Sequence, residues 1–279
     1  MEKIEKGTLY LCPTPIGNLE DITLRTLNVL KNVDLIAAED TRHSLALLNH
    51  FEIKKPLISY FEHNKLERGP ELAQKLLAGE SIALVTDAGT PAISDPGEDL
   101  VKLCIEKSIK VVPLPGANAA ITGLIASGIN TARFTFQGFL PVNKKERREG
   151  LEQVKNYPET LIFYEAPHKI KATLQSMLEV LGDRKICLCR ELTKKFEEFS
   201  PGFITEALER YKSEEPRGEF VIVVSGCENP ECEDECANMS LEEIYENYLA
   251  QGVDFKEAIK LAARDKGLSK REAYDILKK

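Results

Sequence analysis

The stretch SIALVTDAGTPAISDPGED, residues 81–99, decides the fold that this sequence predicts. Residues 82–85 form a short apolar run with β-branched side chains, which is typical of a buried strand. The small residues and the proline of residues 87–91 end that run. A helix start follows, with Asp95 as the cap, Pro96 at the first helical position and Glu98 as the partner in a capping box. The stretch therefore predicts a strand, a tight loop and a helix.

The loop in this stretch is a candidate binding site. Ligands of open α/β sheets bind beyond the carboxyl ends of the strands. Ala88 and Gly89 would let a ligand approach the backbone closely, and Asp87 offers a carboxylate. A structural turn between a strand and a helix can have the same composition, so the segment by itself leaves both interpretations open.

Similar units lie on both sides of this stretch. Strands are predicted over residues 8–12, 34–38, 57–60, 110–114, 133–138, 160–164, 185–190 and 219–224. Helices of about ten residues are predicted between most of them, the first capped by Asp21. This alternation is typical of βαβ units and predicts an α/β fold with a mainly parallel sheet.

Changes in composition divide the chain. A proline-rich turn predicts one α/β domain over residues 1–114 and a second over residues 115–226. Residues 227–239 are acidic and poor in apolar side chains, as in a solvated linker. Residues 240–279 return to helical periodicity and predict a helical appendage. Its helix, glycine turn and helix, with Ser269 and Glu272 as a capping box, could be a DNA-binding unit, but a small packed bundle is the commoner outcome of such a pattern.

Composition excludes several classes of protein. The 279 residues contain no apolar run long enough for a membrane span, and the N-terminus lacks the apolar core of a signal peptide. Seven scattered cysteines favour the reducing cytoplasm over a disulfide framework. The net charge of −8 argues against non-specific nucleic-acid binding, and we expect no DNA partner, but a local basic groove remains compatible with it.

Common catalytic and metal-binding motifs are missing. The sequence contains no G-x-G-x-x-G after the first strand, no P-loop, no G-x-S-x-G and no H-E-x-x-H. Cys227, Cys232 and Cys236 are irregularly spaced and have no obvious fourth ligand, so free cysteines and no metal are expected.

Five ordered stretches resemble one known family. They are TPIGNL (14–19), AEDTR (38–42), DAGTP through DPG (87–97), PLPG (113–116) and RELTK (190–194). Their order and spacing resemble the 16S ribosomal RNA (cytidine-2′-O-)-methyltransferases, which belong to the tetrapyrrole-methylase-like (class III) enzymes that use S-adenosylmethionine. The resemblance covers residues 8–226, and the helical appendage also resembles that of the family.

The resemblance implies two α/β domains with the S-adenosylmethionine cleft between them, in a homodimer. It implies methylation of a cytidine 2′-hydroxyl in the decoding region of 16S rRNA, as free RNA or in the small ribosomal subunit. The residues implied to bind the cofactor are Pro15, Asp87, Ala88, Gly89, Ile93, Asn118, Ala119, Tyr164 and Glu165.

Methyl transfer to a ribose needs a group that takes the proton of the weakly acidic 2′-hydroxyl. The candidates near the predicted loop ends are Glu39, Asp40, Glu191 and Lys194. A structural or binding role is the alternative for each of them. Glu39 and Asp40 could form ion pairs with Arg42, Lys194 could contact a phosphate, and Glu191 could belong to a charge network.

RNA binding requires phosphate contacts, and a basic cluster follows residue 142. The candidates are Arg42, Lys144, Lys145, Arg147, Arg148 and Lys195. A run of charges is more often only a solvated helix face. Phe61, Phe139 and Tyr164 could stack a flipped base, although aromatic residues at strand ends are mostly core residues.

Two alternatives remain open at this point. One is an enzyme of the same fold that methylates a small macrocycle such as a corrin precursor, for which a basic cluster and a helical tail would be superfluous. The other is a non-catalytic RNA-binding module, which would not bind S-adenosylmethionine. A DNA-binding regulator would rest on the tail alone.

Overall fold

The computed structural model describes residues 3–228, 240–250, 252–266, 268 and 270–277. Residues 1–155 and 159–226 form one compact unit, which contains two sheets, and residues 156–158 and 227–279 form another. The predicted boundary between residues 114 and 115 falls where the chain leaves the first sheet and enters a helix that packs on the second.

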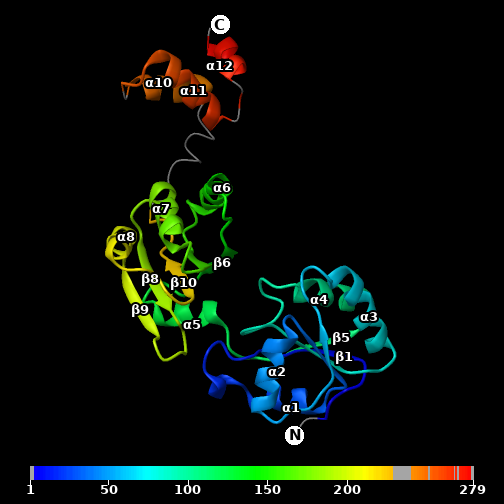
Figure 1. Ribbon diagram of the computed structural model, residues 1–279. Helices are drawn as coiled ribbons and strands as arrows, with labels where there is room; N and C mark the ends of the chain where they lie inside the picture. Colours follow the sequence, from blue (N-terminus) through cyan, green and yellow to red (C-terminus); the bar gives the residue numbers. More distant parts are fainter. Residues whose placement is uncertain (1–2, 229–239, 251, 267, 269, 278–279) are drawn as a thin grey trace. The chain divides into compact units, whose positions relative to one another are not determined.

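The first sheet, in the blue to green part of the chain in Figure 1, is parallel throughout. Its strands lie in the order β3-β2-β4-β1-β5, with bounds β1 Thr8–Leu11, β2 Leu35–Ala38, β3 Leu57–Ser59, β4 Ile82–Val85 and β5 Lys110–Pro113. Both faces are covered by helices, so β2 and β4 are buried on both sides and read as continuous apolar runs.

The covering helices place a crevice between β1 and β4. One face carries α1 (Leu24–Asn32) and α2 (Thr41–His50), and the other carries α3 (Lys65–Leu77) and α4 (Gly97–Glu106). The chain therefore leaves β1 toward one face and leaves the neighbouring β4 toward the opposite face. Such a point is where ligands bind in open α/β sheets.

The second sheet is mixed, unlike the first. Its order is β6-β7-β10-β8-β9, with bounds β6 Phe134–Phe139, β7 Thr160–Glu165, β8 Lys185–Arg190, β9 Glu198–Phe203 and β10 Phe220–Val224. Only β6 and β7 pair in parallel; the other pairs are antiparallel. Helix α5 (Ala119–Ala126) covers one face, and α6 (Lys144–Val154), α7 (Ile170–Leu181) and α8 (Ile204–Ser213) cover the other.

Two elements of the second half were not predicted. Strand β9 contains Pro201, which lacks an amide proton and which is tolerated because β9 is at the edge of the sheet. Helix α6 is largely charged, and its buried side is narrow: Arg147, Leu151 and Val154.

The predicted cap of α1 was wrong. Thr23 is the N-cap, and its Oγ1 accepts a hydrogen bond from the Thr26 amide at 3.0 Å. Asp21 instead ends the 3-10 helix η1 (Leu19–Asp21). Both threonine and aspartate make good caps, and the sequence alone offered two candidates two residues apart.

The start of α4 agrees with its prediction in part. The Asp95 carboxylate accepts a hydrogen bond from the Gly97 amide at 2.8 Å, as a cap would. Pro96, however, precedes the first helical residue, and Glu98 pairs with Lys102 at 2.6 Å instead of closing a capping box.

The C-terminal unit has its own small core. Helices α10 (Leu241–Ala250), α11 (Phe255–Asp265) and α12 (Lys270–Leu277) bury Leu241, Ile244, Ile259, Ala262, Ala263 and Ala273. Ser240 and Glu243 cap the start of α10 reciprocally, because each side chain accepts a hydrogen bond from the other residue's amide, at 3.2 and 2.6 Å. The packed bundle expected from the sequence matches this core, whereas the predicted cap residue Ser269 lies outside the described residues.

No helix in the described parts of the chain combines the length and the apolar character that crossing a membrane requires.

Candidate active site

The loops that follow β1 and β4 are joined by their backbones. The Thr14 amide donates to the Gly89 carbonyl at 2.9 Å, and the Gly89 amide donates to the Thr14 carbonyl at 3.1 Å. Gly89 has φ +83°, and a β-carbon on it would lie 3.1 Å from Cγ2 of Ile16. A glycine is therefore needed where these two loops meet at the crevice.

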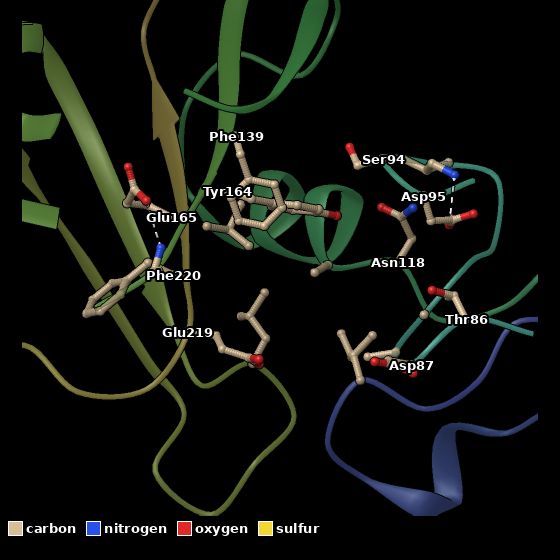
Figure 2. A pocket seen from close by; sticks show the side chains of 18 of the residues that line it. Thr86, Asp87, Ser94, Asp95, Asn118, Phe139, Tyr164, Glu165, Glu219 and Phe220 are labelled. Carbon is tan, nitrogen blue, oxygen red and sulfur yellow. Dashed lines mark hydrogen bonds between the residues drawn. The ribbon is translucent and has the colours of Figure 1, made fainter. Parts of the chain in front are cut away.

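A pocket of about 580 Å³ opens beside this junction, within the size range of small-molecule sites (Figure 2). Loops of the first sheet form one wall, and strand ends and loops of the second sheet form the other. The lining residues are Ile16, Glu39, Thr86, Asp87, Ala88, Gly89, Thr90, Ile93, Ser94, Asp95, Asn118, Ala119, Phe139, Tyr164, Glu165, Ala166, Pro167, His168, Leu192, Glu219, Phe220 and Val221.

The pocket brings together most of the residues predicted to bind a cofactor. The residues Asp87, Ala88, Gly89, Ile93, Asn118, Ala119, Tyr164 and Glu165 all line it. Pro15 does not line it, and its neighbour Ile16 does. Whether the eight lining residues contact a cofactor stays a prediction.

Asn118 and Tyr164 organise the start of α5. The Asn118 Oδ1 atom accepts from the Ile121 amide, and the Tyr164 hydroxyl oxygen accepts from the Ala120 amide, both at 3.1 Å. Burial raises the pKa of Tyr164, so the phenol stays neutral. Its ring makes edge contacts with Phe136 and Phe139, at centroid distances of 4.9 and 5.6 Å, and this gives the pocket an aromatic side.

Glu165 stabilises part of the pocket wall through hydrogen bonds within the protein. Its side chain is buried, and its two oxygens accept hydrogen bonds from the Ala166 amide at 2.8 Å and from the Thr173 hydroxyl at 2.5 Å. Both acceptor atoms are thus used within the protein, and the carboxylate fixes the turn that carries Ala166, Pro167 and His168 into the wall.

Asp95, which was not predicted as a site residue, holds a second stretch of wall. Its carboxylate accepts hydrogen bonds from the amides of Ala92 at 3.0 Å and Ile93 at 3.3 Å, in addition to that of Gly97. Ala92 and Ser94 both have positive φ, at 68° and 63°. Burial raises the pKa of Asp95, and the three amides oppose that effect. The carboxylate therefore sustains an unfavourable loop conformation that presents Ile93 and Ser94 to the pocket.

Glu39 and Asp40 differ as candidate bases. Glu39 lines the pocket, and its Oε2 accepts a hydrogen bond from the Thr86 hydroxyl at 2.6 Å. Asp40 caps α2 and binds the Arg42 guanidinium through both oxygens, at 3.1 and 2.7 Å. These bonds hold the pKa of Asp40 far below its ordinary value, which makes Asp40 a weak base.

Glu191 and Lys194 form a charge network. The Lys194 Nζ atom lies 2.9 Å from Glu191 Oε1 and 2.9 Å from Glu219 Oε2. Burial would raise the pKa of Glu191, but the hydrogen bonds from Lys194 and the Glu219 amide outweigh it and hold that pKa below its ordinary value. Burial would lower the pKa of Lys194, and its two carboxylate partners raise it instead. Lys194 is therefore a cation at neutral pH, not a base, and Glu219 is the member of the network that lines the pocket.

A second, open depression lies along the same loop. It is lined by Gly17, Asn18, Leu19, Glu20, His50, Thr193, Lys194 and Lys195. The two sides are in close contact, since a β-carbon on Gly17 would lie 2.4 Å from Lys194 Cγ. Lys195 thus lies at a surface hollow beside the pocket, and its contact with RNA stays a prediction.

The remaining RNA candidates include one error. Arg147 is only 7% exposed, and its guanidinium donates to the carbonyls of Pro141 and Val142 and to the Ser176 hydroxyl, at 2.9–3.3 Å. It is a structural residue of the second sheet's helical layer, so its assignment to RNA was wrong. The reason is helical geometry, because Arg147 lies on the inward face of α6.

The other basic candidates are on the surface. Lys144 and Arg148 both approach Glu179, at 3.7 and 3.1 Å, and Lys145 lies 3.8 Å from Glu149. The Arg42 side chain is 90% exposed. The exposed pairs of Lys144, Lys145 and Arg148 are weak, so these three cations can exchange their partners for phosphates.

Cysteine and metal predictions are tested only in part. Cys187 and Cys189 are buried in β8, with their sulfur atoms 3.9 Å apart, and Cys227 is half-buried. Cys232 and Cys236 lie outside the described residues. Within the described ranges, no three His, Cys, Asp or Glu side chains are grouped as a metal site would require.

The chain is similar to named proteins along nearly its whole length. The sequence model of the tetrapyrrole (corrin/porphyrin) methylases matches residues 8–208. "Ribosomal RNA small subunit methyltransferase I" of Bacillus subtilis (strain 168) is 51% identical over 276 residues, which cover 98% of this chain and 94% of that protein. The protein of the same name from Synechocystis sp. is 44% identical over 271 residues, 97% of each chain.

Solved structures share the fold. Diphthine synthase aligns with a TM-score of 0.58 at 15% identity over 78% of this chain and 90% of its own. Uroporphyrin-III C-methyltransferase from Thermus thermophilus, complexed with S-adenosyl homocysteine, aligns with a TM-score of 0.56 at 17% identity over 77% and 96%. The predicted pair of α/β sheets of the tetrapyrrole-methylase type is thereby confirmed.

Proposed function

This chain belongs to the tetrapyrrole (corrin/porphyrin) methylases, among the methyltransferases of small-subunit ribosomal RNA, and from this premise we propose its finer specificity. It methylates rRNA with S-adenosylmethionine as the donor. We propose that the acceptor is the 2′-hydroxyl of a cytidine in the decoding region of 16S rRNA. The observation that supports a hydroxyl acceptor is Glu39, a carboxylate inside the pocket with one oxygen engaged by Thr86. The cytidine and the decoding region rest on the resemblance of the five motifs to the 16S rRNA (cytidine-2′-O-)-methyltransferases.

The chemistry of the pocket walls fits S-adenosylmethionine. Among the lining residues Glu39, Asp87, Asp95, Glu165 and Glu219 are acidic, and none is a lysine or an arginine. Such a wall favours a ligand with sulfonium and ammonium groups. The aromatic side around Tyr164 suits a flat base, and Gly89 allows close approach of the ligand to the backbone. We propose Asp87, Ala88, Gly89, Ile93, Asn118, Ala119 and Tyr164 as the residues in contact, with Glu165 supporting the wall.

S-adenosylmethionine supplies, when bound, a methyl group on a sulfonium leaving group. The protein has to position the ribose and to receive its proton. Glu39 is our proposed acceptor of the 2′-hydroxyl proton, because its carboxylate is in the pocket and is not neutralised by an arginine. Asp40 has a different role in this proposal: it orients the exposed Arg42 toward a phosphate.

Surface cations are proposed to hold the RNA. Arg42, Lys144, Lys145, Arg148 and Lys195 are the candidates, with 16S rRNA or the small ribosomal subunit as the partner. We also propose that the chain acts in the cytoplasm as a homodimer, and its mass in solution, measured by light scattering, tests the dimer.

The decisive experiment compares cells with and without this gene. Small ribosomal subunits purified from the deletion strain are incubated with the protein and labelled S-adenosylmethionine, and 2′-O-methylation is mapped along 16S rRNA. We expect one decoding-region cytidine to lose its 2′-O-methyl group in the deletion strain and to regain it in vitro. Methylation of a base, or of a nucleotide elsewhere, would refute the proposed specificity, and failure to bind S-adenosylmethionine in calorimetry would favour a non-catalytic RNA-binding module.

A further inference from the structure

One loop connects the pocket to the neighbouring depression. Leu192 is buried in the pocket wall, and Thr193 to Lys195 line the depression. The loop is fixed by its own contacts: the Thr193 amide donates to Glu197 Oε1 at 2.6 Å, and the Glu197 amide donates to the Lys194 carbonyl at 3.0 Å. The residues that follow Lys194 are therefore held in a defined position a few residues from the pocket.

The next residue along this loop is an exposed aromatic. Phe196 is 66% exposed, more than any other large aromatic residue in the described parts of the chain. The Lys195 Nζ atom lies 5.6 Å from the centroid of its ring. An aromatic ring left in water beside a cation, next to a surface hollow, has the composition of a site for single-stranded nucleic acid, in which bases stack on aromatic rings and phosphates pair with cations.

The path of an RNA substrate agrees with this position. A ribose that reaches Glu39 in the pocket must leave its flanking nucleotides outside, because the pocket has the volume of a small-molecule site. The depression lined by Asn18, His50 and Lys195 adjoins the pocket through the Leu192 loop and is open to solvent. It offers amide, imidazole and ammonium groups to a sugar-phosphate backbone.

We propose that Phe196 is a stacking platform for an unpaired base that flanks the target nucleotide, with Lys195 pairing with an adjacent phosphate. This inference rests on the proposed function, because it requires an RNA substrate. It adds a contact for the substrate that neither the family motifs nor the pocket includes, and it assigns the open depression to the RNA strand.

A fluorescence experiment tests the stacking directly. The sequence contains no tryptophan, so the Phe196→Trp variant carries a single indole. Titration with unmethylated 16S rRNA, which unlike the assembled subunit brings no tryptophan of its own, should quench its emission as a base stacks on the ring. The matched control is Phe203→Trp, because Phe203 is also exposed, at 39%, and lines neither the pocket nor the depression. Equal emission changes in the two variants would overturn the proposal.

Affinity measurements separate stacking from simple apolar contact. Phe196→Leu should weaken binding of the subunit by roughly fivefold or more, and Phe196→Tyr should keep wild-type affinity, because only the tyrosine retains a π face. Lys195→Gln should reduce the slope of log affinity against log salt, and Phe196→Leu should leave that slope unchanged. Wild-type affinity in Phe196→Leu, with the unsubstituted protein binding normally, would contradict the stacking role alone; absence of binding by the unsubstituted protein would instead contradict the proposed function.

Discussion

Gly116 and Pro13 lie in contact where the loops after β5 and β1 meet: a β-carbon on Gly116 would come within 2.4 Å of the Pro13 Cβ atom. The proline ring is rigid, so the backbone itself would have to move. Both residues lie in loops at the carboxyl edge of the first sheet, and the chain continues from Gly116 to the pocket residues Asn118 and Ala119. This close packing fixes where the second wall of the pocket begins.

This contact predicts that adding one methyl group at Gly116 strongly destabilises the protein. Gly116→Ala should lower the free energy of unfolding by about 2 kcal/mol, as overpacking of a rigid site does. Gly150→Ala is the matched control, because Gly150 is helical and its β-carbon would meet Leu140 Cδ2 at 3.8 Å, an ordinary contact. We expect the control to gain about 0.5–1 kcal/mol. Chemical denaturation measures both, and equal effects would contradict the packing argument.

Substitutions of Glu39 and of Asp40 should have different effects on kcat and KM. Glu39→Gln should lower kcat about 10²–10⁴-fold while leaving the affinity for S-adenosylmethionine close to that of the wild type, as expected for loss of a general base. Asp40→Asn should keep most of kcat and raise KM for the ribosomal subunit, because Arg42 loses its bidentate partner. Initial rates at varied subunit concentration distinguish the two. A large loss of kcat in Asp40→Asn alone would reverse the assignment.

Arg147 and Lys145 should also behave differently, although they are neighbours in one basic cluster. Arg147→Ala should destabilise the protein by about 2 kcal/mol or more, because it leaves the Pro141 and Val142 carbonyls without their charged donor. Lys145→Ala should leave the melting temperature unchanged and weaken RNA binding at low salt. Thermal melts and binding titrations on the two variants check this pair; an unchanged melting temperature for Arg147→Ala would contradict its structural role.

The low pKa of Glu198 predicts that part of the free energy of unfolding is lost at acidic pH. Hydrogen bonds from Arg210, together with those from Ser200 and Arg190, lower its pKa from 4.5 to about 2 against the effect of burial. Since the folded pKa is the lower one, the stabilisation is complete above pH 4.5 and is lost as the pH falls toward 2. Glu198→Gln should therefore lower the free energy of unfolding by about 1 kcal/mol at pH 7 and have little effect near pH 2. Denaturant titrations at several pH values measure the difference, and a constant difference across that range would argue against it.

The C-terminal helices should be separable from cofactor binding. Deletion of residues 240–279 removes a unit with its own core, so the rest should fold and bind S-adenosylmethionine as before. Because this segment carries several lysines and arginines, its loss should weaken binding to the small ribosomal subunit. Calorimetry and subunit binding test the two halves of this prediction, and unchanged subunit affinity would refute the role of the tail.

Sequence reasoning located one wall of the pocket well, because the residues of that wall are close in sequence. Asp87, Ala88 and Gly89 lie in one strand-loop-helix unit whose turn chemistry is local, and Ile93 of the same unit was named from the family resemblance. Leu192 and Glu219 were not predicted, because they come from loops of the second sheet, and only the order of its strands brings them to the same pocket. No periodicity in the chain encodes that order. Tyr164 and Glu165 of that sheet were named from the family resemblance alone.

The two errors in the second half have different physical origins. The β9 strand contains Pro201 and Gly202, which normally argue against a strand, and only its edge position permits them. Arg147 could have been recognised: together with Leu151 and Val154 it occupies positions i, i+4 and i+7 of one helix, which is the buried face. Arg147 was grouped with its charged neighbours, and its place on the apolar face of the helix was therefore overlooked.

Pro201 also affects how the molecule behaves toward other chains. An outer strand of a sheet presents amide and carbonyl groups that a foreign strand could pair with, and this is a common route to aggregation. In β9 that row of groups is interrupted at its middle, where the imino acid has no proton to donate. An incoming strand could not form a hydrogen bond at that position. Pro201, which argues against a strand in the sequence, therefore also protects the enzyme against unwanted sheet extension at high concentration.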